Sequence, residues 1–222
     1  MLPGVGRSGF KGYTEFFAHL RGIAQRTQGR LVSVVAAANA KISEDGEWEG
    51  RDNPVFQLYK EMFLPPLIQR ECDEMIEKLA KGMNVTFDTA SLACIYHETG
   101  GHPYITRQLC SHIATNHRSR PLSVDQTLVM DNIPSFITRK GDIFKEILDR
   151  LDRFFPEERE IFNLIVKGVS NGDDLANQTN QPIDLILRHL LGYQIVEYRD
   201  HKYQVKINLL RRWMDCELIT TR

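Results

Sequence analysis

Apolar residues recur at helical spacing along most of the chain. Stripes of this kind run through residues 14–27, 68–81, Asp88 to Gly100, and from Pro103 onward. Apolar positions three and four residues apart line one face of a helix, so each stripe predicts a helix. An aspartate and a proline suit the first positions of a helix, and a glycine suits its end. The last three stripes predict a small helical bundle over residues 61–118.

One short run breaks this pattern. Residues 31–38, LVSVVAAA, are almost continuously apolar and include three valines. The run is short for a helix and predicts a strand that is covered on both faces, as in a parallel sheet. Nothing else in the first 150 residues resembles a second buried strand. We therefore expect the neighbouring strands to come from elsewhere, with this chain as part of something larger.

Polar or weakly patterned segments connect these elements. Residues 41–54 are polar and glycine-rich and predict a loop. The next ten residues predict a short helix and then an extended piece that ends at Pro65-Pro66. Over residues 123–150 the pattern weakens, and it predicts two short helices around a bend at Pro134.

A distinct rhythm begins at Pro156. A helix is followed by the turn Asn171-Gly172, a short helix, and PIDLILRHLL, whose apolar residues fall at i, i+3, i+4, i+7 and i+8. QIVEY and YQVKI then alternate as strands joined by RDHK, which predicts a hairpin. Three helices followed by a hairpin are the order of a winged helix. The fold class is therefore expected to be mainly α, with a remnant of an αβ core in front.

Composition and charge limit the expected binding partners and cellular compartment. The 28 Lys and Arg balance 29 Asp and Glu, so no overall field favours nucleic acid or an anionic membrane. The four cysteines form no C-x-x-C pair, and three fall on apolar helix faces, which predicts a reducing cytosol without disulfides or a zinc site. No apolar run reaches the roughly 18 residues that span a bilayer, and no signal peptide is apparent. We expect a soluble, cytoplasmic chain.

Candidate chemistry is sparse. The opening Gly4-x-Gly6-x-x-Gly9 has no room for a preceding strand, and Gly9 is followed by Phe10-Lys11 instead of the Gly-Lys-Ser/Thr of a P-loop. It therefore predicts a surface loop. No histidines are spaced H-x-x-x-H, and no G-x-S-x-G nucleophile turn occurs. We predict no catalytic residue and no metal ligand.

A longer run suggests a family. NPVFQLYKEMFLPPL, followed by EMIEKLAKGMNVTFDTASLACIYHETGGHPYITRQLCSHI, resembles the helical lid of the AAA-related STAND class of P-loop ATPases, particularly its archaeal-ATPase-like branch. Gly101-His102-Pro103 matches the Gly-x-Pro motif of that lid. The resemblance extends over about residues 10 to 215. It implies a remnant of the ATPase core with a helix and the sensor-1 strand, a helical lid, a helical linker and a winged helix, at residues 1–60, 61–122, 123–154 and 155–222.

The resemblance also implies nucleotide-binding residues. Asn39 would be sensor 1 at the end of the strand, although an Asn there also suits a plain turn, and Lys41 is the nearby basic residue. The turn Gly101-His102-Pro103 would pack against adenine, or would simply start a helix. Arg107 would be a second sensor, or a solvated arginine on an amphipathic helix. Arg21 would project across a subunit interface as an arginine finger, or lie on the surface.

Two parts of a phosphoryl-transfer site are missing from this pattern. The sequence has no Walker A lysine and no Walker B acidic run. The first 17 residues resemble the loop after Walker B, so the chain looks like the C-terminal half of such an ATPase, or a descendant that lost its front. It would act as a nucleotide-sensing regulatory half without independent hydrolysis. ATP or ADP with Mg would bind only with the missing P-loop core, or with another chain that replaces it.

Other functions stay open. A winged helix can bind DNA, with PIDLILRHLL in the major groove and RDHK as the wing; Arg188, His189, Arg199 and Lys202 would then make the contacts. Asp184 and the small number of cations make a weak electrostatic surface for DNA, and the resemblance implies instead a clamp on the nucleotide domain. A third interpretation is a scaffold that oligomerises through an exposed sheet edge at residues 31–38.

Overall fold

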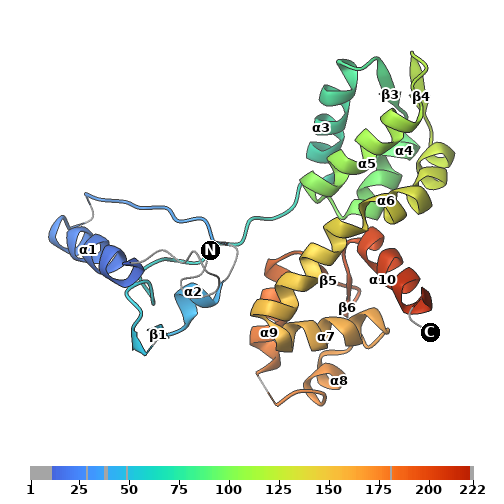
Figure 1. The fold of residues 1–222 in the computed structure, drawn as a ribbon. Helices are drawn as coiled ribbons and strands as arrows, with labels where there is room; N and C mark the ends of the chain where they lie inside the picture. The colour runs from blue at the N-terminus through green and yellow to red at the C-terminus, as the bar shows by residue number, and fades with distance from the viewer. Residues whose placement is uncertain (1–11, 29, 38–39, 49, 181, 221–222) are drawn as a thin grey trace. The chain divides into compact units, whose positions relative to one another are not determined.

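The computed structural model describes residues 12–28, 30–37, 40–48, 50–180 and 182–220, and it divides the chain into two units (Figure 1). The N-terminal unit covers residues 1–63, and the C-terminal unit covers residues 64–222. The described residues are mainly helical, as the sequence predicts, and their strands occur in pairs.

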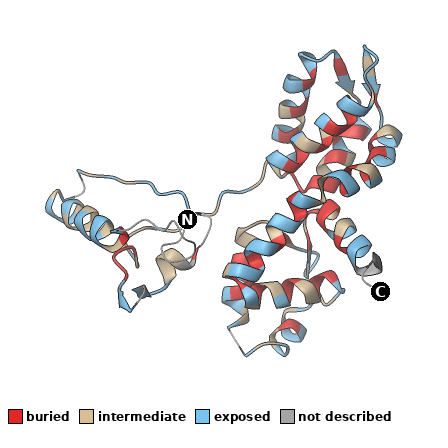
Figure 2. Cartoon of the chain, in the orientation of Figure 1, coloured by how far each residue is buried: buried red, intermediate tan, exposed pale blue. Residues whose placement is uncertain are grey.

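The N-terminal unit is small and sparsely buried. The helix predicted at residues 14–27 is confirmed as α1, and the predicted polar loop contains a short helix and a short antiparallel hairpin: α1 (Tyr13–Arg26), α2 (Lys41–Glu44), β1 (Glu47–Trp48) and β2 (Arg51–Asp52). Asn53 holds this region together, because its amide nitrogen donates to the carbonyl groups of Ile42 and Asp45, at 2.8 Å each. Figure 2 shows few buried residues in the described part of this unit.

The strand predicted at residues 31–38 does not form over its described part, residues 31–37. Residues 31–37 have no regular secondary structure, and Val32 and Val34 are 80% and 92% exposed. A strand requires backbone partners on a neighbouring strand, and the described residues supply none for this segment. The apolar pattern therefore identified a segment suited to a sheet, but no sheet lies beside it.

The bundle predicted in the C-terminal unit is confirmed, with one addition. Its helices are α3 (Gln69–Lys81), α4 (Thr89–Thr99) and α5 (Pro103–Asn116), and two three-residue strands, β3 (Val85–Phe87) and β4 (Leu122–Val124), pair in parallel beside them. Asp88 begins α4 as expected, since its carboxylate accepts the backbone N–H of Ser91 at 2.7 Å. Asp125 starts the next helix in the same way, at 2.7 Å from the N–H of Leu128.

The segment around Pro134 differs from the prediction. Two helical stretches, together labelled α6 (Gln126–Phe154), meet as expected, but the first continues through Pro134 and the backbone departs from helical geometry at Lys140 instead (φ −124°, ψ 17°). Pro134 has no N–H for the carbonyl of Met130, and Met130 is exposed, so water can satisfy that carbonyl and the helix continues. The bend predicted at Pro134 is therefore wrong by six residues.

The last part of the chain follows the predicted order and then adds a helix. Three described helices precede an antiparallel hairpin: α7 (Pro156–Val166), α8 (Gly172–Ala176), α9 (Ile183–Gly192), β5 (Val196–Arg199) and β6 (Lys202–Val205). We call these elements the C-terminal module. The added helix, α10 (Asn208–Thr220), contacts both α4 and α6. Its apolar Leu209, Leu210 and Met214 are buried.

A single hydrophobic core runs through the C-terminal unit. Figure 2 shows buried residues along α4, α5, α6 and α9, and the core includes Phe136 and Phe144 on α6 and Phe162 on α7. No described helix, α6 included, combines the length and the apolar composition needed to cross a bilayer.

Candidate functional site

The turn between α4 and α5 contains the Gly-x-Pro motif. Gly100 and Gly101 both have positive φ, 60° and 73°, which side chains with a Cβ rarely adopt. Two such residues in succession end α4 and reverse the chain. His102 then caps α5, with Nδ1 accepting the N–H of Ile105 at 3.5 Å, and Pro103 occupies the first turn. We call residues 100–103 the glycine turn.

Two distant segments pack closely against the glycine turn. The N–H of Leu67, in the segment that leads into α3, donates to the carbonyl of Gly101 at 3.1 Å. A Cβ on Gly101 would lie 2.2 Å from the carbonyl oxygen of Leu67, and one on Gly100 would lie 2.8 Å from that of Lys206. Lys206 lies just after the hairpin of the C-terminal module. The glycine turn therefore joins the beginning of the bundle to the C-terminal module.

Charged and polar groups surround this junction. Glu98, at the end of α4, is 2% exposed and accepts two hydrogen bonds from the guanidinium of Arg212 on α10, at 2.8 and 2.9 Å. The amide of Asn208 donates to the carbonyl of His97 at 2.8 Å. Lys206 donates to the Gln194 side chain at 2.7 Å, and burial lowers its pKa although Glu197 opposes the shift. These groups pair with one another and hold the junction together, and they form no acid–base or nucleophile pair.

The predicted nucleotide-binding residues of the bundle have unequal exposure. Gly101 is buried, His102 is half-buried, and Pro103 and Arg107 are exposed along one side of α5. Burial lowers the pKa of His102, which favours its neutral imidazole. The exposed pair is therefore what a ligand can reach, while Gly101 shapes the turn.

Other predicted residues lie elsewhere. Asn39 and the opening glycine motif fall outside the described residues. Arg21 is half-buried and donates to the carbonyl of Pro54 at 3.4 Å, within its own unit. Among described residues no group of three or more His, Cys, Asp or Glu side chains is arranged to hold a metal ion.

The residues proposed for DNA contacts divide between surface and core. Arg188, Arg199 and Lys202 are exposed, and Arg199 lies 3.7 Å from the carboxylate of Asp200. The exposed position expected for His189 is wrong. Its side chain is fully buried, and its Nδ1 lies 2.6 Å from the buried carboxylate of Glu158 on α7. His189 follows Ile186 by three residues, a spacing that places it on the apolar face of α9 and would have predicted its burial.

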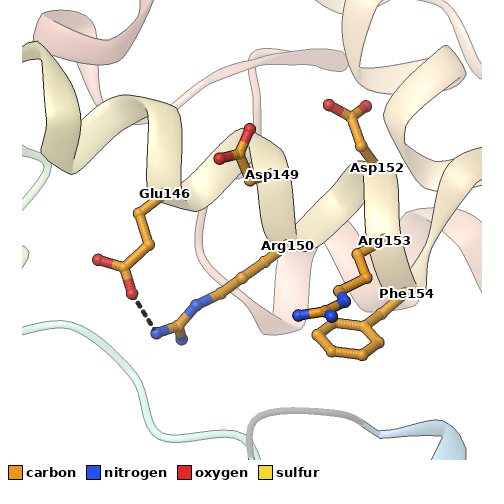
Figure 3. A pocket seen from close by; sticks show the side chains of 6 residues that line it. All are labelled: Glu146, Asp149, Arg150, Asp152, Arg153 and Phe154. Carbon is orange, nitrogen blue, oxygen red and sulfur yellow. Dashed lines mark hydrogen bonds and ion pairs between the residues drawn. The ribbon is translucent and has the colours of Figure 1, made fainter. Parts of the chain in front are cut away.

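A shallow depression of about 600 Å³ lies along the last turns of α6 (Figure 3). Its lining consists of Glu146, Asp149, Arg150, Asp152, Arg153 and Phe154. The charges largely neutralise one another: Arg150 pairs with Glu146 at 2.6 Å, and Asp152 accepts from Arg159 at 2.9 Å. The guanidinium of Arg153 lies over the Phe154 ring, 5.6 Å from its centroid. This is a solvated helix face, and we place the candidate site at the glycine turn.

Comparison with known proteins gives two similar structures. No protein-family model matches the chain, and no curated protein matches it. A Walker-type ATPase of Pyrococcus abyssi aligns over 73% of this chain with 14% identity and a TM-score of 0.47. A variant of RuvB from Thermotoga maritima aligns over 70% with 17% identity and a TM-score of 0.34. The aligned regions cover 46% and 52% of those two chains, so this chain spans about half their length.

Proposed function

We propose that this chain is the nucleotide-sensing regulatory half of a STAND-type P-loop ATPase, with the bundle as its lid and the C-terminal module as a winged helix. The observation that carries the proposal is the packing of the glycine turn. Leu67 pairs with Gly101 on one side, and Lys206 contacts Gly100 on the other. A shift of this turn on ligand binding is passed directly to the segment leading into the bundle and to the C-terminal module.

The exposed groups on α5 suit a nucleotide in part. The ring of Pro103 offers an apolar face for adenine, and the Arg107 guanidinium, one turn along, offers paired donors for a phosphate. Gly101 and His102 hold the shape of the turn. A P-loop core, from a longer form of the protein or from another chain, would supply the phosphate loop and Mg²⁺. In this proposal the chain alone does not hydrolyse ATP.

The test compares Mg·ADP binding by this chain alone with binding by the chain together with its P-loop core, supplied by a longer form of the protein or by another chain. We expect binding only where a P-loop is present, and Arg107→Ala should weaken it by about tenfold or more, as for a lost charged hydrogen bond. Arg118→Ala removes another exposed arginine of the same unit and should leave binding unchanged. ATP turnover by this chain alone that persists through purification, or equal affinity of the Arg107 variant, would contradict the proposal.

A further inference from the structure

The kink in α6 separates two sets of contacts. Before Lys140, α6 is tied to α5: His112 Nε2 lies 2.8 Å from Ser135 Oγ, and the Asn116 amide donates to Asn132 at 3.0 Å. After the kink, α6 leads into α7, and Asp152 accepts from Arg159 at 2.9 Å. The first half of α6 therefore contacts the bundle through these bonds, and the second half leads into the C-terminal module. The rings of Phe136 and Phe144 meet across the kink, with 6.3 Å between centroids.

Helix α10 contacts both the kink in α6 and the bundle. Trp213 lies against Gly141, next to the kink, where a Cβ would be 2.6 Å from the indole nitrogen. The adjacent Arg212 holds Glu98 on α4 through two hydrogen bonds. The Trp213 ring also packs beside Phe144, with 6.1 Å between centroids. Two adjacent residues of α10 thus contact the two regions: Trp213 packs at the kink, and Arg212 binds the bundle.

From these contacts we propose that Lys140–Gly141 is a hinge between the bundle and the C-terminal module, and that α10 is a strap holding it closed through Arg212 and Trp213. The Glu98 carboxylate favours two discrete states, with α10 either bound to the bundle or released from it. It is buried and paired while the strap is in place, and a buried carboxylate without its partner is costly. Release therefore requires Glu98 to reach water, and it frees the neighbouring glycine turn.

This device concerns motion within the C-terminal unit and requires no nucleotide, so it can fail or succeed independently of the proposed function. Its first test is hydrogen exchange of the amides of α10. Arg212→Gln removes the guanidinium and should accelerate their exchange on the order of tenfold or more. Arg211→Gln, at an exposed position of the same helix, is the matched control and should exchange like the wild type.

The second test measures the hinge itself. Spin labels at the exposed positions Lys78 on α3 and Asp174 on α8, with Cys216→Ser, report the separation of the bundle from the C-terminal module. We expect one narrow distance distribution in the wild type and in Arg211→Gln. A second, longer distance should appear in Arg212→Gln. It should also appear in Gly141→Ala, whose added methyl displaces Trp213.

Each remaining outcome decides the question. Faster exchange in α10 with unchanged label distances means that the helix frays without a hinge, and it overturns the proposal. Unchanged exchange and distances in both variants also overturn it. If Arg212→Gln does not fold, Arg212→Lys keeps the charge beside Glu98 but loses the paired geometry. It must then show the longer distance for the proposal to stand.

Discussion

At the scale of single residues, two glycines determine how the bundle meets the C-terminal module. Gly100 and Gly101 take positive φ in succession, and each lies against a backbone carbonyl from another segment. A Cβ at either position would therefore meet backbone, which cannot rotate away as a side chain can. This close approach, more than the turn itself, makes glycine necessary here.

Gly101→Ala should destabilise the C-terminal unit by about 2–4 kcal/mol, because it combines the left-handed penalty with a clash 2.2 Å from the Leu67 oxygen. Gly168→Ala is the matched control. Gly168 also has positive φ (98°), but a Cβ there would meet nothing within 4 Å, so only the conformational cost of about 1–2 kcal/mol applies. Urea unfolding measures both. Equal losses in the two variants would mean that the contact with Leu67 is unimportant.

The residues that begin helices were predictable from the sequence. The contacts between residues far apart in the sequence were not. The cap at Asp88 and the proline at the start of α5 follow from rules that involve only neighbouring residues. The Glu98–Arg212 pair joins residues 114 positions apart, and no local pattern relates them. The exposed position expected for His189 is wrong, because Glu158 provides its ring with a buried partner.

At the scale of elements, hydrophobic spacing identified most of the longer helices and the β5–β6 hairpin, and it missed β3, β4, α10 and the extent of α6. Strands β3 and β4 have three residues each, too few for an alternating pattern to stand out. The kink at Lys140 arises where Gly141 admits Trp213, a tertiary contact that the local sequence does not encode. The α10 stripe of Leu209, Leu210, Trp213 and Met214 was visible in the sequence and would have predicted that helix.

The seam between α5 and α6 should make stability depend on pH. His112 is buried there, and burial together with Arg139 and Lys140 lowers its pKa. The unfolded chain then binds the proton more tightly, so this contribution to stability is complete above the unfolded pKa of about 6.5 and falls as the pH drops below it.

His112→Gln should reduce this dependence, since glutamine retains a hydrogen-bonding side chain but does not titrate. Urea unfolding at about pH 7.5 and about pH 5 compares it with the wild type and with His201→Gln, an exposed hairpin position. The wild type and His201→Gln should lose more stability on acidification than His112→Gln. An identical loss in all three proteins would show that His112 does not contribute to the pH dependence.

At the scale of the whole molecule, the two units differ in how much of their apolar surface they bury. The C-terminal unit encloses a core of more than thirty buried residues, whereas the described part of the N-terminal unit buries few and exposes the apolar segment 31–37. The sequence predicted that this segment needs a partner layer, and the structure supplies no such layer among the described residues. A partner outside the chain cannot be read from the chain's own pattern.

Among the described residues, the exposed apolar segment 31–37 pairs with no strand, and such a segment is a template for strand addition. We therefore expect this chain, on its own, to self-associate as its concentration rises, and Val34→Lys to suppress that association. Val34 is 92% exposed, so the substitution should leave the folded unit intact while placing a charge where strands would pair. Met62→Lys, at another exposed apolar position of the same unit (83%), controls for the added charge alone. Sedimentation velocity over a concentration series separates the cases: association lost in Val34→Lys and retained in Met62→Lys assigns the contact to residues 31–37, and association in all three proteins assigns it elsewhere.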